Sequence, residues 1–386
     1  MTAPTQAPTQ KNRLHWMDNL RTIIIALVVL YHAGGVYEST GMWGWFWIVD
    51  DPDIWMASGI IGIMFDTFVM PAIFLISGYL AAASINGKTA WGFIEGKAKR
   101  LLLPWVLAIL TLIPLYKAIF LYSRGLPQEN WTTYFHITNP NSQNWLWFLP
   151  LLFVFSLIYL GIDRLGINLK KINLVWGLIV GLLLCVGFSY LIGNIAGFRS
   201  WTLTPLIDFE NERLLAHFLF YLFGAAAYQQ NLFDKLPEKK TLYNIANGVS
   251  WLPVTGHIFI RIWPFFVSSF EVTPLYRILW FTSFHLSSIV MVYVMVESFR
   301  FYFNKTTKVW QELSRNSYGV YIIHVVVIGI FGTLLLGVDL PGWAKYLILF
   351  ALSYLGSNLI VSLYRYLRSA LARKRTQEVL QGVEVG

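Results

Sequence analysis

Arg21 and His32 are the polar side chains that the sequence places best for chemistry. They bound the apolar run LRTIIIALVVLYH and are eleven residues apart. On a helix this spacing returns to within about 20° of the starting direction, so both lie on one face, about 16 Å apart along the axis. Asp18 can pair with Arg21 one turn earlier. A His in lipid is costly and indicates a functional site; the alternative is a structural His32 with Arg21 as a cytoplasmic anchor.

Other polar residues also fall in apolar runs. Asp66 could orient His32 or pair with an Arg, because an unpartnered carboxylate in lipid is costly. His285 lies at a depth comparable to that of His32, and His324 lies nearer the inner side. For both, the alternative to a functional role is a helix-to-helix hydrogen bond. Ser77 precedes a glycine. We expect it to allow close helix packing rather than to act as a nucleophile, since no base is near it in the sequence.

The composition indicates a membrane protein. Of 386 residues, 56% are hydrophobic and 13% are charged, and the mean hydropathy is +0.56, whereas soluble domains carry about 25% charged residues. The single Cys185 allows no intramolecular disulfide. No metal site is expected, since the His residues are scattered and no His-x3-His pattern occurs.

The apolar runs predict one all-α, polytopic transmembrane bundle of about ten helices. The predicted helices lie near 20–37, 58–83, 101–120, 145–163, 173–195, 214–230, 243–262, 276–298, 317–337 and 343–366. Pro71 and Pro104 are expected to kink their helices. Residues 1–15 form a disordered tail, 16–368 the integral membrane domain and 369–386 a basic cytoplasmic tail.

The basic residues predict the orientation. They gather in every second connection, at 88–100, 164–171, 235–240, 300–315 and 365–375. By the positive-inside rule these segments are cytoplasmic, and so are both termini. The same placement beside anionic lipid explains the net charge of +9 without a nucleic-acid partner.

Aromatic residues mark the outer loops. The first loop contains Trp43, Trp45, Trp47 and Trp55, and the second contains Trp131, Tyr134, Trp145 and Trp147. These side chains form either an interfacial aromatic belt or a platform on which sugar rings stack.

Several motifs in order resemble the acyltransferase family 3 proteins, in the style of the glucan biosynthesis protein C branch. The opening MDNLR with its R-x10-H spacing resembles the family's first helix. MPAIFLISGYL, with Ser77, is similar to its second helix, and KAKRLLLP to the basic entry of its third. NWLWFLP, with Trp147, is similar to the family's Leu-Trp-Phe signature, and SYGVYIIH, from Ser317 through Tyr321 to His324, to its Ser-Tyr…Tyr…His helix.

The resemblance implies transfer of an acetyl or other short acyl group from cytoplasmic acyl-CoA, a co-substrate and not a bound cofactor, to a hydroxyl of an extracytoplasmic glycan or related acceptor. It implies that His32 is the catalytic base and Arg21 its essential partner. Physics permits both roles, because a neutral His can take the acceptor proton and Arg21 can bind CoA phosphates. The remaining candidates for substrate binding are Asp18, Asp66, Lys97, Lys99, Arg100, Trp147, His285, Ser317, Tyr321 and His324.

An outer loop gathers charged residues. Asp208, Glu210, Glu212 and Arg213 lie in an outside loop that ends near His217. They either bind the acceptor or are solvated. The family implies a multi-pass protein of the bacterial inner membrane, with the bilayer, acyl-CoA and a glycan or lipid-linked acceptor as partners.

Two other functions fit parts of the pattern. Buried Arg, Asp and His could form a pathway through a transporter or flippase, although no internal repeat is evident. A membrane sensor or assembly factor could keep a polar core for packing alone, but it would not need the basic cluster Lys97–Arg100 beside Arg21.

The loop charges predict the topology. Reporter fusions at Arg375 and near Asp51 should give opposite signals, since the first site is cytoplasmic and the second external. Equal signals at both sites would contradict the assigned orientation.

Overall fold

The structure is a computed structural model that describes residues 14–38, 47–130, 132–133, 143–234, 236 and 240–384, with side chains as far as residue 373. Twelve α-helices occur in this part of the chain. They are α1 (His15–Gly34), α2 (Met56–Asp66), α3 (Val69–Ile85), α4 (Ala90–Ser123), α5 (Phe148–Arg164), α6 (Leu174–Ile195), α7 (Leu214–Gln229), α8 (Thr241–Val249), α9 (Trp251–Ile262), α10 (Pro274–Tyr302), α11 (Lys308–Leu335) and α12 (Gly342–Glu384).

The remaining elements are short. Strands β1 (Trp201–Thr202) and β2 (Phe209–Glu210) pair antiparallel, Trp201 opposite Glu210. The 3-10 turns are η2 (Asn144–Trp147), η3 (Leu169–Lys171), η4 (Asn211–Arg213) and η5 (Trp263–Phe266). The hairpin and η4 connect α6 to α7 and bring the charged segment 208–213 to the end of the bundle.

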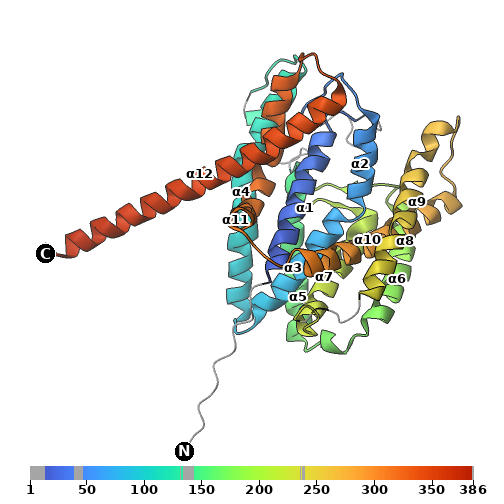
Figure 1. Ribbon diagram of the computed structural model, residues 1–386, viewed down its shortest axis with the longest axis horizontal. Coiled ribbons are helices and arrows are strands. Elements are labelled where there is room, and N and C mark those ends of the chain that lie inside the picture. Colours follow the sequence, from blue (N-terminus) through green and yellow to red (C-terminus); the bar gives the residue numbers. More distant parts are fainter. Residues whose placement is uncertain are drawn as a thin grey trace, which may run out of the picture.

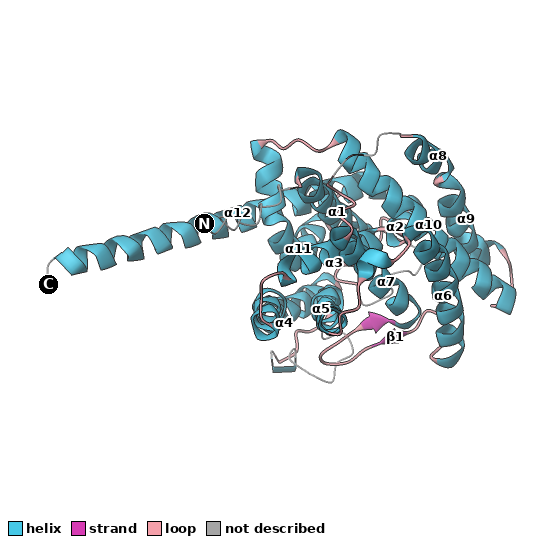
Figure 2. Cartoon of the chain, turned by 90° about the horizontal axis from the view of Figure 1, so that it is seen from below, coloured by secondary structure: helices cyan, strands magenta, loops and turns pink. Residues whose placement is uncertain are grey.

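The bundle confirms the predicted all-α transmembrane fold. Within the described residues, eight helices are long and apolar enough to cross a membrane. The predicted segments near 214–230 and 243–262 correspond to the shorter α7 and to the α8–α9 pair. Figure 1 shows the helices side by side, with the C-terminal part of α12 projecting beyond the bundle. Figure 2 shows α1 and α3 near the centre and α4, α6 and α8 toward the edge.

Two predicted helices are each interrupted, and a proline explains both breaks. The segment 58–83 divides into α2 and α3 at Thr67 and Phe68. Pro71 has no N–H to donate to the carbonyl of Thr67, and the Ser288 hydroxyl of α10 donates to that carbonyl instead. The segment 243–262 divides at Ser250, where Pro253 leaves the carbonyl of Val249 without its helical donor.

The two predicted tails differ in how much of them the structure describes. Residues 1–13 of the predicted tail lie outside the described residues. At the other end, α12 continues to Glu384 through the segment assigned to the basic tail. The boundaries at 15 and 368 stay predictions.

An ion cluster ties the first outer loop to α12. The Lys345 ammonium is fully buried and donates to Asp51 at 3.1 Å and to Asp53 at 2.6 Å. A buried ammonium is costly unless it is paired, so Lys345 holds the chain before α2 against the start of α12. Lys345 is therefore a structural ion-pair partner in the fold.

The closest helix crossing joins α3 and α7 through two glycines. A Cβ on Gly78 would lie 1.8 Å from the Tyr221 carbonyl oxygen, and one on Gly224 would lie 1.9 Å from that of Leu75. The two backbones therefore touch, as in other membrane helix pairs with small residues at the interface. Gly78 follows Ser77, so the Ser-Gly pair places Ser77 beside this crossing.

The crossing predicts that Gly78→Ala destabilises the protein by about 1–3 kcal/mol or more, because the obstructing atom is backbone and the helices must separate. Gly161→Ala in α5 is the matched control, since a Cβ there meets nothing within 4 Å. Thermal unfolding of detergent-purified variants measures the difference. Equal melting temperatures would show that the close α3–α7 contact does not limit the thermal stability of the protein.

Candidate active site

Two cavities lie inside the bundle, beside the two ends of α1. The inner cavity, of about 330 Å³, borders Arg21 near the start of α1 and also Lys97, Arg100 and Ser317. The outer cavity, of about 140 Å³, borders His32 near the end of the same helix. The predicted face of α1 therefore borders both cavities.

Helix α11 holds Arg21 in the inner cavity. The Arg21 Nε donates to the Ser317 hydroxyl at 3.1 Å, and Nη2 donates to the Ser314 carbonyl and hydroxyl, each at 3.1 Å. Asp18 approaches the same guanidinium at 3.4 Å. Ser317, a candidate for substrate binding, thus orients Arg21.

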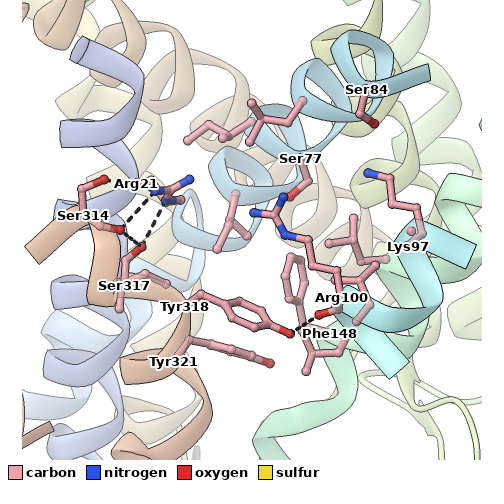
Figure 3. A pocket seen from close by; sticks show the side chains of 18 of the residues that line it. Arg21, Ser77, Ser84, Lys97, Arg100, Phe148, Ser314, Ser317, Tyr318 and Tyr321 are labelled. Carbon is pink, nitrogen blue, oxygen red and sulfur yellow. Dashed lines mark hydrogen bonds between the residues drawn. The ribbon is translucent and has the colours of Figure 1, made fainter. Parts of the chain in front are cut away.

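Helix α4 supplies the cations of the opposite wall. Figure 3 shows Lys97 and Arg100 across the cavity from Arg21. The Tyr318 hydroxyl donates to the Arg100 carbonyl at 2.6 Å and ties α11 to α4. Lys88 and Arg315 also line this cavity; the sequence assigned both to inner loops, without a role in the site.

Lys99 does not line the inner cavity. Its ammonium pairs with Glu95 on the exposed side of α4. Two residues on a helix are separated by about 200°, so Lys97 and Lys99 face opposite directions. The structure thus places Lys99 away from Lys97 and Arg100, and its role in substrate binding stays a prediction.

His324 of α11 lies against His32 of α1. The His324 Nδ1 donates to the Tyr321 carbonyl at 2.7 Å, because a carbonyl oxygen only accepts. Its Nε2 therefore carries the lone pair and faces the His32 Nδ1 at 3.3 Å. The His32 Nδ1 also donates to the Val28 carbonyl at 2.8 Å. Both contacts place the His32 proton on Nδ1, which makes Nε2 the basic nitrogen.

Two pairs of side chains link α1 to α11 at two levels of the bundle. Arg21 and His32 occur on α1, and Ser317 and His324 occur in the same order on α11. Each of the two residues on α1 contacts its counterpart on α11. Because His324 is fully buried, the contact fixes the ring of His32 rather than offering a second site to substrate.

Asp66 pairs with two arginines of the outer side. Its carboxylate binds Arg213 through two hydrogen bonds of 2.8 Å, and Arg261 contacts it at 3.2 Å. Glu210 contacts the same Arg213 at 3.0 Å. Of the two roles proposed for Asp66, the structure therefore places it in an ion pair with Arg. Arg261 was not recognised as a site residue, since a helix-end Arg carries no distinguishing signal.

Glu210 lines the outer cavity, and its carboxyl group has a shifted pKa. Burial raises the pKa of Glu210, although the neighbouring Arg213 guanidinium opposes the shift. Asp208 and Glu212 are buried in the same segment rather than solvated. Asp208 accepts from Gln143 at 3.2 Å and from the Thr204 N–H at 2.8 Å, so it stabilises the connection before α7.

Aromatic rings cover the outer cavity. Trp147 lies in η2 and packs edge-on against Trp201 with ring centroids 5.6 Å apart. Both line the cavity with His217, which stacks on Phe74 at 4.8 Å. Trp47 stacks on His32 at 5.4 Å. Four aromatic residues of the predicted belt lie outside the described residues: Trp43, Trp45, Trp131 and Tyr134.

His285 lies apart from this cavity wall. Its Nε2 is 2.9 Å from the Ser189 hydroxyl of α6, which itself donates to the Glu212 carbonyl. Since the hydroxyl proton is committed to that carbonyl, the Nε2 of His285 is the donor. His285 therefore links α10 to α6, and its tautomer is the opposite of that of His32.

Comparison with known proteins identifies the family. Residues 14–362 match the family model described as an acyltransferase domain, so the chain belongs to acyltransferase family 3. This match covers α1 to α11, the first part of α12 and the residues that line both cavities. No curated protein and no solved structure matches the chain significantly.

The hydrogen bonds predict opposite tautomers for two histidines of one protein. In ¹⁵N NMR spectra of histidine-labelled protein, His32 should be protonated at Nδ1 and His285 at Nε2. His324→Phe should shift His32 toward a mixture of tautomers, because Val28 alone then accepts from Nδ1, and should leave His285 unchanged. An Nε2-protonated His32 in the unaltered protein would contradict this geometry.

Proposed function

We propose that this acyltransferase moves an acetyl or another short acyl group from cytoplasmic acyl-CoA to a hydroxyl of an extracytoplasmic glycan or lipid-linked acceptor. The observation that carries the proposal is the pair of cavities along α1, one bordered by cations and the other by His32. The family assignment supports the reaction class.

The inner cavity supports binding of the CoA phosphates. Arg21, Lys97 and Arg100 contribute positive charge to its walls from two helices. Phosphate oxygens form short, charge-assisted hydrogen bonds with such groups. Exposed Arg315 and Lys88 line the same cavity, where they would attract an anionic donor from the cytoplasm.

The outer cavity supports the chemical step. The acceptor hydroxyl attacks the thioester carbonyl carbon while the His32 Nε2 takes its proton. The tetrahedral intermediate then collapses, the C–S bond breaks, and the CoA thiolate leaves and receives the proton from His32. An acyl-enzyme is not required, because donor and acceptor meet at one base.

The charges of the outer cavity favour a neutral acceptor group. Arg213 lies between Asp66 and Glu210, and Arg261 also contacts Asp66. These pairs compensate both guanidinium groups, so a phosphate or carboxylate would have to break an existing pair. Trp147 and Trp201 line the same cavity with aromatic rings. A sugar ring with free hydroxyls suits these walls better than an anionic group.

The proposed setting is the inner membrane of a bacterium. The two cavities lie beside opposite ends of α1, so donor and acceptor reach the enzyme from opposite sides of the membrane. Acyl-CoA is a consumed co-substrate in this proposal.

The proposal predicts sided transfer. In oriented vesicles, acetyl-CoA on the cytoplasmic side should release free CoA in the presence of methyl glucoside on the other side. His32→Ala should lower kcat by about 10²- to 10⁴-fold, because the general base is lost. Lys97→Gln should raise the KM for acetyl-CoA about tenfold to hundredfold, since one charge-assisted contact contributes about 1.5–3 kcal/mol.

Lys99→Gln is the matched control for Lys97→Gln. It removes the same charge two residues away but outside the inner cavity, so the KM should change little. Passage of methyl glucoside without CoA release would favour a transporter. Full activity of a well-expressed His32→Ala variant would remove His32 from the mechanism.

A further inference from the structure

The inner and outer cavities meet at three shared side chains. Ile73, Phe148 and Tyr321 line both cavities. They come from α3, α5 and α11, so no single helix controls the opening. We call these three residues the ring.

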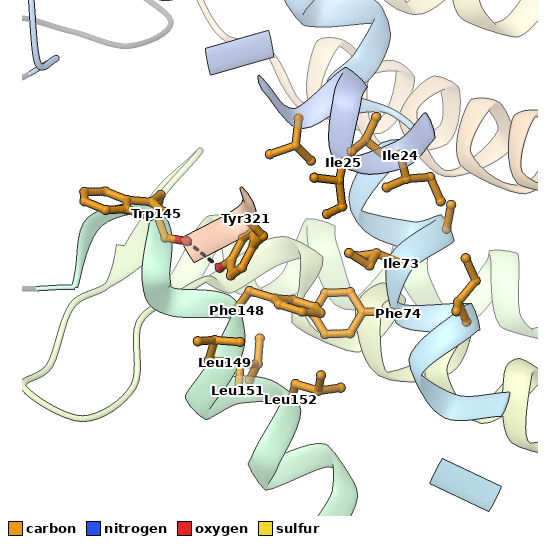
Figure 4. Close-up of a cluster of buried hydrophobic side chains, with 14 of the residues drawn as sticks. Ile24, Ile25, Ile73, Phe74, Trp145, Phe148, Leu149, Leu151, Leu152 and Tyr321 are labelled. Atoms are coloured by element: carbon orange, nitrogen blue, oxygen red, sulfur yellow. Dashed lines mark hydrogen bonds between the residues drawn. The ribbon is translucent and has the colours of Figure 1, made fainter. Parts of the chain in front are cut away.

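The three residues of the ring are buried. Ile73 is 8% exposed, Phe148 is 5% exposed and Tyr321 is 6% exposed. Figure 4 shows the three side chains together at the centre of the buried cluster. A passage closed by such side chains admits uncharged groups more readily than ions.

Neighbouring contacts hold two ring members in place. The Tyr321 hydroxyl donates to the Trp145 carbonyl at 2.6 Å. Phe148 packs edge-on against Tyr321, with centroids 5.8 Å apart, and against Phe74 at 4.9 Å. The aromatic side of the opening is therefore set by the fold, whereas Ile73 forms its aliphatic side.

The position of the ring gives it a role if the proposed function holds. The cations of the inner cavity lie on one side of the ring, and His32 lies on the other. An acyl group bound to CoA must therefore pass Ile73, Phe148 and Tyr321 before its carbonyl reaches His32. The CoA phosphates need not pass.

We propose that the ring selects the acyl group by its width. Narrow, unbranched acyl groups pass between Ile73 and the two aromatic rings, and branched groups are rejected there. Length is limited separately by the outer cavity, whose 140 Å³ must also hold the acceptor hydroxyl. The ring residues thus determine donor specificity without taking part in proton transfer.

Butyryl-CoA and isobutyryl-CoA test width directly, because their acyl groups contain the same atoms and differ only in branching. The unaltered protein should prefer butyryl-CoA in kcat/KM, measured as release of free CoA. Ile73→Ala should shift the isobutyryl-to-butyryl ratio upward by about tenfold or more, the scale that one methyl group contributes in an apolar pocket. Phe148→Ala should shift it in the same direction.

Phe155→Ala is the matched control. Phe155 is two turns after Phe148 on α5 and is equally buried, but it lines neither cavity. Its variant should keep the original ratio even if stability falls. Because a ratio compares two donors on one preparation, partial unfolding of any variant does not change it.

Each outcome decides a different point. An upward shift in both ring variants and none in Phe155→Ala supports selection at the ring. An unchanged ratio in Ile73→Ala and Phe148→Ala, with acetyl transfer intact, overturns the ring while the proposed function stands. Absence of CoA release from every acyl-CoA by the unaltered protein overturns the proposed function and the ring with it.

Discussion

The parallel packing of α1 on α11 is the contact on which the site depends. It brings Ser317 to Arg21 at one level and His324 to His32 at another. Within α1, Asp18 and the Val28 carbonyl already contact Arg21 and His32. The second helix adds Ser317 and His324, and His324 together with Val28 keeps the His32 proton on Nδ1.

Lipid makes polar pairing a condition of the fold. Asp66 is paired with Arg213 and Arg261, and buried Lys345 is paired with Asp51 and Asp53. Removing one partner from such a pair leaves an uncompensated charge and typically costs about 3–5 kcal/mol. These pairs constrain the outer loops and α9 around the cavity, so the same interactions serve the stability and the shape of the site.

The sequence predicts much of the fold because lipid allows few alternatives. Apolar length located the predicted segments, and the absence of an N–H on Pro71 explains the break after α2. Helical periodicity placed Arg21 and His32 on one face. The same periodicity places Lys97 and Lys99 on opposite sides of α4.

The remaining site residues depend on contacts between distant segments. Asp66 and Arg261 are 195 positions apart, and no local pattern indicates that they meet. His324 could be placed on a helix, but its contact with His32 required knowing that α1 and α11 are neighbours. Pairing across the bundle depends on tertiary structure, whereas helical periodicity indicates only which residues share a face of one helix.

The ring of Ile73, Phe148 and Tyr321 has an electrical consequence. Wherever water fills the cavities on both sides of the ring, the membrane potential falls mainly across the apolar side chains between them. Each elementary charge that crosses these side chains exchanges about 2.3 kcal/mol with every 100 mV. An ion would also have to shed its water there, which an uncharged thioester does not. The three buried side chains therefore oppose the movement of ions from one cavity to the other.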